Sequence, residues 1–294
     1  ASDVYKRQIV DDHSTDGTAE FLSKINDRRI TVLPARPLPK GWLGKPNALQ
    51  TAFDYLSQDT EVVIAVDADV RFTKDALVRS VNSLNKADFI SIYPQQIATS
   101  FSERLIQPLL PWSWMSSVVV RLAELFPHPT TAIANGQCMV YRYSSLAEIG
   151  GFTSIASEVL DDIALAKHFF RSNFRGHVVQ GAEIVSTRMY SNWSEIKSGY
   201  GKSLYPTFKA MGSAALAALL IATSIFPFIS LIWASKTGFI ACAAIIGTRL
   251  FSGLSARNRI IDSLLHSLSI AALILLLIYS YRYRGSIRWK GRVV

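Results

Sequence analysis

The spacing of hydrophobic and polar residues alternates between strand-like and helix-like segments over the first two thirds of the chain. Ile9–Val10 and Ile30–Leu33 are short apolar runs, and a Pro/Gly-rich loop over residues 34–45 precedes a helical pattern over 47–56. Val62–Val66 is a continuous apolar run, which is typical of a strand buried on both faces. This alternation predicts an α/β fold with a doubly wound sheet, whose binding site lies at the carboxyl ends of the strands.

The last third of the chain has a different pattern, because long uncharged segments replace the alternation. Residues 210–235 form an uncharged run of 26 and residues 263–281 a run of 19, and a bilayer crossing takes roughly 20 residues. The run over 237–248 has only 12 residues and extends to a span only if Lys236 or Arg249 reaches the interface with its charged end. We predict two crossings with a short interfacial or re-entrant middle segment in preference to three crossings.

The net charge of +9 comes wholly from this apolar region. The 294 residues include 31 Lys and Arg against 22 Asp and Glu, and residues 204–294 contain 10 of the basic residues and one acidic residue, Asp262. Basic flanks beside apolar spans are typical of membrane proteins, whereas a nucleic-acid-binding domain would carry its charge on a polar folded face. We therefore predict a multi-pass membrane protein whose basic C-terminal tail lies on the cytoplasmic side.

Three acidic clusters follow apolar segments, at Asp11–Asp12, at Asp67 with Asp69, and at Asp161–Asp162. Two carboxylates two residues apart after a strand can face one divalent cation and leave positions open for phosphate; turn chemistry is the simpler interpretation. Asp161–Asp162 precede a helical pattern that runs to Phe170, so they would open a helix, where the helix dipole favours ionised carboxylates. Such a pair is either a capping aid or a rigidly held catalytic base. We expect all three clusters at the same edge of the sheet.

Several common catalytic patterns are missing from the sequence. Lys45 follows Gly44 and can present its ammonium to a phosphate, but the chain has no Walker A motif and no GxGxxG, which disfavours P-loop hydrolysis and Rossmann dinucleotide binding. No GxSxG elbow occurs either. Cys138 and Cys242 lie far apart without a CxxC, so neither a disulfide framework nor a zinc site is indicated.

The order of the motifs resembles one known family, the family-2 glycosyltransferases of the GT-A fold, and within it the membrane branch that includes hopene-associated and carotenoid glycosyltransferases. The resemblance covers residues 9 to about 205 and, less sharply, Trp289–Arg292. It implies a GT-A type doubly wound mixed sheet followed by C-terminal transmembrane helices. The segments that carry it are Val10–Thr18, Pro37–Lys45, Asp67–Asp69, Asn135–Gln137, Gly150–Phe152, Leu160–Asp162 and Arg188–Tyr190.

The resemblance also implies a role for each cluster. Asp67 and Asp69 would hold Mg²⁺ or Mn²⁺ on the diphosphate of a nucleotide-sugar donor. Asp162, beside Asp161, would take the proton of an acceptor hydroxyl that attacks the anomeric carbon from the opposite face, with inversion. The implied donor-binding residues are Asp11, Asp12, Lys45 and Asp67. Because such donors are cytosolic, the resemblance also implies that the catalytic domain, with Lys197, Lys202 and Lys209, faces the cytoplasm at a bacterial inner membrane.

The implied acceptor is the hydroxyl of a membrane lipid. Where processive polysaccharide synthases carry QxxRW, this chain has Val185–Met189 and keeps only the arginine, which favours transfer of a single sugar to a carotenoid, hopanoid or other polyprenoid. Residues expected at the acceptor or the membrane interface are Arg188, Trp193 and Lys202. Two alternatives are a polyprenyl phosphate acceptor and a non-catalytic membrane binding or assembly module with the same fold.

The chain is expected to have three parts. Residues 1–8 are expected to be a non-native leader, residues 9–203 the catalytic domain, and residues 204–294 a membrane region with two to three helices. The family begins with a βα portion of roughly 30 residues before the first acidic pair. Its absence implies a truncated chain in which the first strand is missing, and truncation could leave this polypeptide inactive.

Overall fold

The computed structural model describes residues 5–117, 124–284, 288–289 and 292–293, and the chain forms two compact units. The chain passes from one unit to the other several times, so neither unit is a continuous stretch of sequence. Unit 1 contains residues 1–66, 80–91 and 127–177, and unit 2 contains residues 67–79, 92–126 and 178–294.

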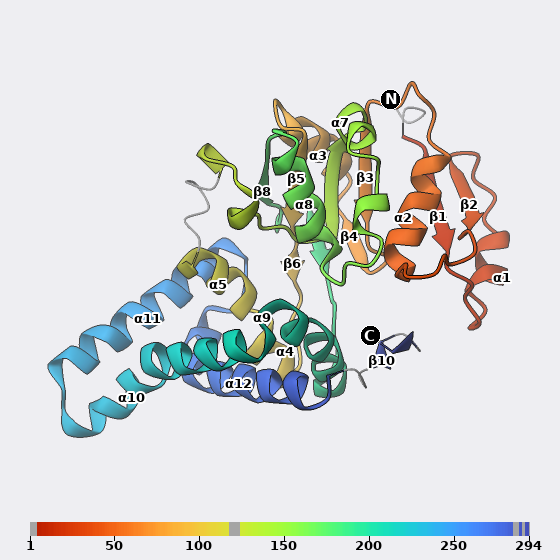
Figure 1. Cartoon of the computed structure of the whole chain (residues 1–294). Helices are drawn as coiled ribbons and strands as arrows, with labels where there is room; N and C mark the ends of the chain where they lie inside the picture. The colour runs from red at the N-terminus through yellow and green to blue at the C-terminus, as the bar shows by residue number, and fades with distance from the viewer. Residues whose placement is uncertain (1–4, 118–123, 285–287, 290–291, 294) are drawn as a thin grey trace. The chain divides into compact units, whose positions relative to one another are not determined.

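Unit 1 is an α/β unit, as the alternation in the sequence predicts (Figure 1). Its elements are β1 (Arg7–Asp11), α1 (Thr18–Ser23), β2 (Ile30–Pro34), α2 (Gly44–Asp54), β3 (Val62–Val66), η2 (Pro129–Thr131), β7 (Cys138–Arg142), α7 (Tyr143–Glu148), η3 (Thr153–Ile155) and α8 (Asp161–Arg171). Three further elements have residues in both units, namely α3 (Ala76–Leu84), β5 (Phe89–Tyr93) and β8 (Gly176–Gln180).

The strands form mixed sheets, which confirms the predicted α/β class. Strands β3, β7, β5 and β8 lie in this order in a four-stranded sheet, and β7 runs antiparallel to both β3 and β5. The parallel pair β1–β2 is a separate two-stranded sheet. Strand β1 begins at Arg7, inside the segment 1–8 that we expect to be a leader; residues 1–4 of that segment lie outside the described residues.

Strand β3 occupies the residues predicted for it, but the expected burial on both faces is wrong. Its residues are half-buried, and Val66 is 38% exposed. The reason is that β3 is the first strand of the four-stranded sheet and pairs only with β7 there. The core of unit 1 instead lies against β7 and α8, where the Tyr141 and Phe169 rings stack at 5.8 Å.

Unit 2 combines a small sheet with long helices. Strands β4, β9 and β6 form a three-stranded sheet in which β9 is antiparallel to β4 and parallel to β6. The elements of unit 2 are β4 (Val70–Phe72), β6 (Gln95–Gln96), α4 (Phe101–Ile106), α5 (Leu109–Ser117), β9 (Val185–Thr187), α9 (Trp193–Ser224), α10 (Phe226–Ser230), η4 (Leu231–Trp233), α11 (Lys236–Ser255), η5 (Ile260–Leu265), α12 (His266–Arg282), β10 (Arg288–Trp289) and β11 (Arg292–Val293).

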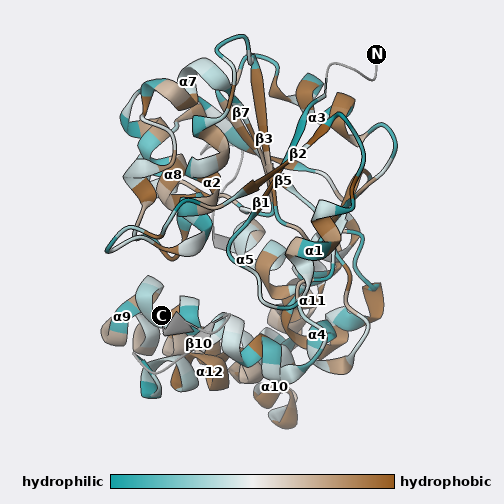
Figure 2. Cartoon of the chain, turned by 90° about the vertical axis from the view of Figure 1, so that its right-hand side faces the viewer, coloured by the Kyte–Doolittle hydropathy of each residue, from teal (hydrophilic) through white to brown (hydrophobic). Residues whose placement is uncertain are grey.

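Three helical segments among the described residues are long and apolar enough to cross a membrane, namely Trp193–Trp233, Lys236–Ser255 and Ile260–Arg282. Figure 2 shows hydrophobic colouring on α10 and α12, and α9 packs along α12. Helix α9 continues across residues 203 and 204, where the sequence predicts a domain border. Lys290, part of the predicted basic tail, lies outside the described residues.

The middle segment is longer than the uncharged run suggested. Helix α11 has 20 residues and continues through Arg249 to Ser255. Arg249 is 3% exposed, so its charge lies inside unit 2 and does not need to reach the membrane interface. By length and composition, α11 is therefore a third candidate span.

Candidate active site

Two adjacent carboxylates open helix α8, as the sequence predicts. Asp161 and Asp162 are its first two residues, and both are partly buried. The Asp162 carboxylate accepts two backbone hydrogen bonds, from Gly136 N–H at 2.7 Å and from Ile163 N–H at 2.8 Å. These bonds fix the orientation of the carboxylate, as the chemistry of a base requires.

A loop before strand β7 brings Gly136 to this pair. A single hydroxyl holds the loop in place, because Ser91 Oγ accepts from Asn135 N at 2.7 Å and donates to Asn135 O at 3.1 Å. A Cβ at position 136 would lie 3.1 Å from both Asp162 Cβ and Lys45 Nζ. The close approach of the loop to the acids therefore depends on a residue without a side chain.

Lys45 lies beside the same two acids. Helix α2 begins at Gly44, so the structure replaces the end of the predicted loop by the first helical turn. The Lys45 ammonium is 3.4 Å from Asp161 Oδ2 and donates to Gly136 O at 3.3 Å. The structure thus brings together three residues that the sequence assigns to donor binding and catalysis.

The surroundings of Asp162 change its protonation. Burial, and then the negative charge of Asp161, raise the pKa of Asp162 to about 6, although Lys45 and the two backbone N–H groups favour the ionised form. A carboxylate with a pKa near 6 is ionised at neutral pH and is a stronger base than an ordinary aspartate. This is the protonation behaviour expected of a general base.

The first acidic cluster lies at the end of β1. Asp11 is the last residue of that strand, and its Oδ1 accepts from Ser14 N at 3.3 Å. Asp12 follows in the loop that leads to α1 and is half-buried. Both residues therefore lie at the carboxyl end of a parallel strand. Strand β1 belongs to a two-stranded sheet separate from the sheet of β3, so the three acidic clusters do not follow strands of one sheet, and the expectation of a single shared sheet edge is wrong.

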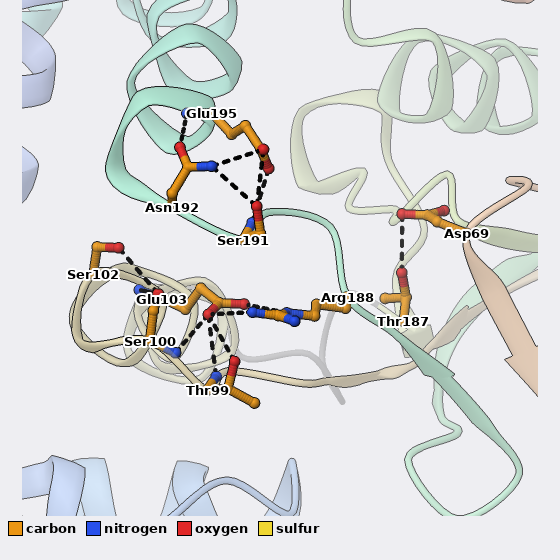
Figure 3. Close-up of polar contacts among 10 residues, drawn as sticks. All are labelled: Asp69, Thr99, Ser100, Ser102, Glu103, Thr187, Arg188, Ser191, Asn192 and Glu195. Carbon is orange, nitrogen blue, oxygen red and sulfur yellow. Dashed lines mark hydrogen bonds and ion pairs between the residues drawn. The ribbon is translucent and has the colours of Figure 1, made fainter. Parts of the chain in front are cut away.

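The second acidic cluster, Asp67 with Asp69, belongs to unit 2 and forms the turn between β3 and β4. Asp69 Oδ2 accepts a hydrogen bond from Thr187 Oγ1 of β9 at 3.1 Å (Figure 3). Among the described residues, no group of three or more His, Cys, Asp or Glu side chains could hold a metal ion. Two carboxylates fit Mg²⁺ all the same, because Mg²⁺ usually takes one or two carboxylates and completes its shell with waters and phosphate oxygens.

A buried glutamate that the sequence analysis missed holds Arg188. Glu103 of α4 has a fully buried side chain, and its carboxylate accepts from Arg188 Nε at 2.9 Å and Nη2 at 3.2 Å (Figure 3). Ser100 N–H donates to the same carboxylate at 2.6 Å, within a capping box. Burial opposes the charge, but the bonds from Arg188, Ser100 and Thr99 lower the pKa of Glu103 to about 2. The pattern Ser-x-x-Glu over residues 100–103 was the local signal that could have located this glutamate.

The other residues expected at the interface lie on α9. Trp193 is the first residue of this helix and is 37% exposed, and Lys202 lies further along it and is half-buried. Tyr190 precedes the helix and is buried; burial and the charge of Asp69 raise the pKa of its phenol. No acceptor contact of these residues is tested by the structure, so their role stays a prediction.

The mixed sheets, the acidic turn after β3 and the acid pair that opens α8 define a GT-A-like α/β protein followed by long apolar helices. The family model described as glycosyl transferase family 2 matches residues 4–150, half of the chain. The chain therefore belongs to glycosyl transferase family 2.

Three similar solved structures share 18% or less of their sequence with this chain. A mannosyltransferase of Pyrobaculum calidifontis, PcManGT, solved with GDP-Man and Mn²⁺, has 18% identity and a TM-score of 0.46, covering 95% of this chain and 77% of that one. A mycobacterial protein has 15% identity and a TM-score of 0.40, covering 73% and 63%. TarS of S. aureus (residues 1–349), solved with UDP-GlcNAc, has 13% identity and a TM-score of 0.39, covering 98% and 86%. At these values their ligands say nothing about the ligands of this chain. No protein with a curated description matches the sequence.

Proposed function

We propose that this chain transfers a single sugar, with inversion at the anomeric carbon, from a nucleotide-diphosphate sugar to the hydroxyl of a membrane lipid. The observation that carries the proposal is the Asp162 carboxylate of a family 2 chain, held by two backbone N–H groups and with its pKa raised to about 6. A fixed carboxylate of this kind can remove a hydroxyl proton at neutral pH.

The residues of the chain perform the remaining steps. As the acceptor oxygen forms its bond to the anomeric carbon, Asp162 takes the hydroxyl proton, and the bond from that carbon to the diphosphate breaks with its electron pair on the diphosphate oxygen. Lys45 offers an ammonium beside Asp161 and would bind a donor phosphate. Asp11 and Asp12 would contact the nucleoside.

Asp67 and Asp69 would hold a divalent cation, Mg²⁺ or Mn²⁺. Bound there, the cation would supply charge neutralisation for the leaving diphosphate. Thr187 restrains Asp69 through its hydroxyl hydrogen bond, which reduces the number of orientations available to this carboxylate.

Three candidate spans support a lipid acceptor, because a chain that crosses the membrane would meet its acceptor in the bilayer. The absence of QxxRW around Arg188 supports one transfer per acceptor, and we propose a carotenoid, hopanoid or other polyprenoid as the acceptor. We further propose a multi-pass protein whose catalytic part faces the cytoplasm, where nucleotide sugars are made.

The proposal is tested by expressing the full-length gene in bacterial membranes and searching the extracted lipids by mass spectrometry for hexose-sized adducts. Purified protein is then assayed with nucleotide sugars, with and without Mg²⁺ or Mn²⁺. Asp162→Asn and Asp69→Ala should each abolish transfer, while Asp59→Asn, which changes an exposed aspartate in a turn, should leave transfer unchanged. Unchanged turnover of Asp162→Asn would refute the assignment of the base, and an active wild-type protein that modifies only soluble acceptors would refute the lipid acceptor.

A further inference from the structure

A group of polar side chains is buried where α5, α11, η5 and α12 of unit 2 pack together. Arg249 is 3% exposed and His266 is fully buried, and Ser252 and Ser269 lie three residues after them on the same two helices. Residues three apart share a helix face. Together with Gln107, which precedes α5 and is also buried, these residues form what we call the Arg249 cluster.

Contacts and charges join the members of the cluster. Arg249 Nη1 donates to Pro108 O at 2.7 Å, next to Gln107 in the chain. The His266 ring packs edge-on against Trp112 of α5, with ring centroids 4.7 Å apart. The charge of Arg249 acts electrostatically on both His266 and Asp262.

Most polar atoms of the Arg249 cluster have no hydrogen-bond partner within the described part of the chain. These atoms are Arg249 Nε and Nη2, both ring nitrogens of His266, the hydroxyls of Ser252 and Ser269, and Gln107 Nε2. Buried polar atoms are ordinarily paired, and a buried cation is costly without a counter-charge. Arg249 Nε, Arg249 Nη2 and Gln107 Nε2 can only donate hydrogen bonds, and the serine hydroxyls and the His266 ring can donate as well.

The acid that acts on Arg249 is already engaged by a second arginine. Asp262 is 2% exposed and its Oδ1 accepts from Arg104 Nε at 2.9 Å and Nη2 at 2.6 Å. Asp262 is thus bonded to Arg104 and acts on Arg249 only through its charge, so one carboxylate stands against two arginines and a positive charge is left over. The cluster lacks an anion.

The free edge of the Arg249 guanidinium matches a phosphate. Nε and Nη2 lie on one edge of the planar group and can donate two parallel hydrogen bonds, while Nη1 is held by Pro108 O. Phosphate oxygens accept such paired bonds, and hydroxyl and amide groups can complete the set.

The cluster lies at the end of the candidate spans that borders the sheet of unit 2. Arg249 is in the last third of α11 and His266 is the first residue of α12, so both are close to the segment that connects these helices. In that segment Arg257 donates to Glu183 Oε1 at 2.7 Å, and its carbonyl accepts from Gln95 of β6 at 3.2 Å. The apolar helices α11 and α12 therefore adjoin the polar residues of the small sheet at this end of the candidate spans. In a membrane protein, such a border between apolar and polar surface lies near the lipid headgroups.

Apolar side chains surround this level and face outwards. Each exposes half of its surface or more, and they are Phe251, Leu254, Ile260, Ile261 and Leu264. A lipid whose hydrocarbon chain lies along these side chains could therefore place its headgroup at Arg249.

We propose that the Arg249 cluster binds the phosphate of a membrane lipid, with the lipid's hydrocarbon chain over these outward-facing residues. The proposal does not depend on the catalytic assignment. The phosphate can belong either to a structural phospholipid or to a polyprenyl phosphate that serves as a substrate. Both lipids present the same phosphate to Arg249 and differ in their tails.

Native mass spectrometry of the full chain in a neutral detergent tests the proposal. The delipidated protein is titrated with phosphatidylglycerol, with undecaprenyl phosphate, and with diacylglycerol, which has the tails without the phosphate. We expect one saturable site per chain for phosphate lipids and none for diacylglycerol. Tighter binding of undecaprenyl phosphate would identify a substrate-like ligand, and equal or tighter binding of phosphatidylglycerol a structural lipid; both outcomes support the site.

The variants separate this site from general attraction to a basic surface. Arg249→Met should weaken phosphate-lipid binding by at least about tenfold, and Arg249→Lys should weaken it less. Arg284→Met removes an exposed arginine of the same unit, stacked on Tyr281, and should bind as the wild type does.

Three results would overturn the proposal. They are saturable binding by Arg249→Met equal to that of the wild type, equal binding of diacylglycerol and phosphate lipids, and an absence of saturable binding by the wild type, which would mean that water fills the cluster. If Arg249→Met does not fold, the double variant Ser252→Ala/Ser269→Ala should weaken phosphate-lipid binding severalfold, and unchanged binding by it would count against the site.

Discussion

Replacing Asp162 with asparagine should abolish sugar transfer and, at the same time, stabilise the folded chain at neutral pH. Asparagine has nearly the same shape and carries no charge, but its single carbonyl oxygen can accept only one of the two backbone N–H groups, from Gly136 and Ile163, that the carboxylate accepts. The variant therefore removes the cost of holding an ionised carboxylate beside Asp161 in a partly buried position, together with one backbone hydrogen bond, and only the charge makes its effect depend on pH.

The magnitude follows from the protonation of Asp162. Burial and the charge of Asp161 raise its pKa from 3.8 to about 6, and a difference of about 2 pKa units corresponds to about 3 kcal/mol. Because the side chain is only partly buried, solvent screening makes this value an upper limit. For a unit of this size, it would raise the Tm by no more than about 10 °C.

The sign depends on pH. A carboxyl whose pKa is raised on folding binds its proton more tightly in the folded state, so its favourable contribution is complete below pH 3.8 and is lost as the pH rises through 6. The advantage of Asp162→Asn over the wild type should therefore be largest above pH 7 and shrink as the pH falls towards 4. Transfer by the wild type should fall as the pH drops below about 6, because the base becomes protonated.

Thermal unfolding of the donor-free protein in detergent, followed between pH 4 and pH 8, measures this difference. Asp59→Asn is the matched control, since it removes an exposed carboxylate and should change the Tm little at any pH. A difference in Tm between Asp162→Asn and the wild type that does not change with pH would show that the pKa of Asp162 is not raised in the folded state.

Three further substitutions test other parts of the candidate site. Glu103→Gln should lower the free energy of unfolding by about 2 kcal/mol, because it removes the carboxylate that accepts two bonds from an arginine; chemical denaturation measures the change. Thr187→Val should raise the Mg²⁺ or Mn²⁺ concentration for half-maximal transfer by about tenfold or more, because Asp69 loses its hydroxyl partner. Gly199→Ala should destabilise the chain by about 1–3 kcal/mol, because the added methyl would overlap the Tyr190 ring.

Each of these three substitutions has a control variant, either in the same element or at a comparable position. Glu195→Gln changes an exposed glutamate in the first turn of α9 and should cost less than Glu103→Gln. Ser186→Ala lies beside Thr187 on β9 and should leave the metal requirement unchanged. Gly212→Ala, where the nearest side-chain atom to the added methyl is 3.5 Å away, should be neutral or slightly stabilising. Equal effects within a pair would contradict the corresponding contact.

The local features of the site could be predicted from the sequence, and the long-range contacts could not. The position of Asp161–Asp162 in the first turn of a helix followed from the apolar periodicity after it, and the strand before Asp67 followed from five consecutive apolar residues. The pairing of Arg188 with Glu103 joins residues 85 positions apart, and no local pattern specifies such a partner.

The sequence was misleading where a charge is buried. Arg249 interrupts an uncharged run, and a charge counts against a span when its partners are unknown. In the structure, the packing of α11 against α5 encloses the guanidinium and supplies the Pro108 carbonyl. A hydropathy value is assigned to each residue type separately, so it cannot predict that other helices will bury this guanidinium.

Gly136 donates its N–H to Asp162 and accepts a hydrogen bond from Lys45 at its carbonyl. Its backbone is outside the left-handed region, so only the shortage of space opposes a larger residue, whose Cβ would lie 3.1 Å from Asp162 Cβ and from Lys45 Nζ. A methyl group there would press on the base and on the lysine at once while leaving the aromatic core of unit 1 untouched. In evolutionary terms, selection at this position would act through turnover and hardly through folding, and a glycine kept here in related chains would mark those that still transfer sugar.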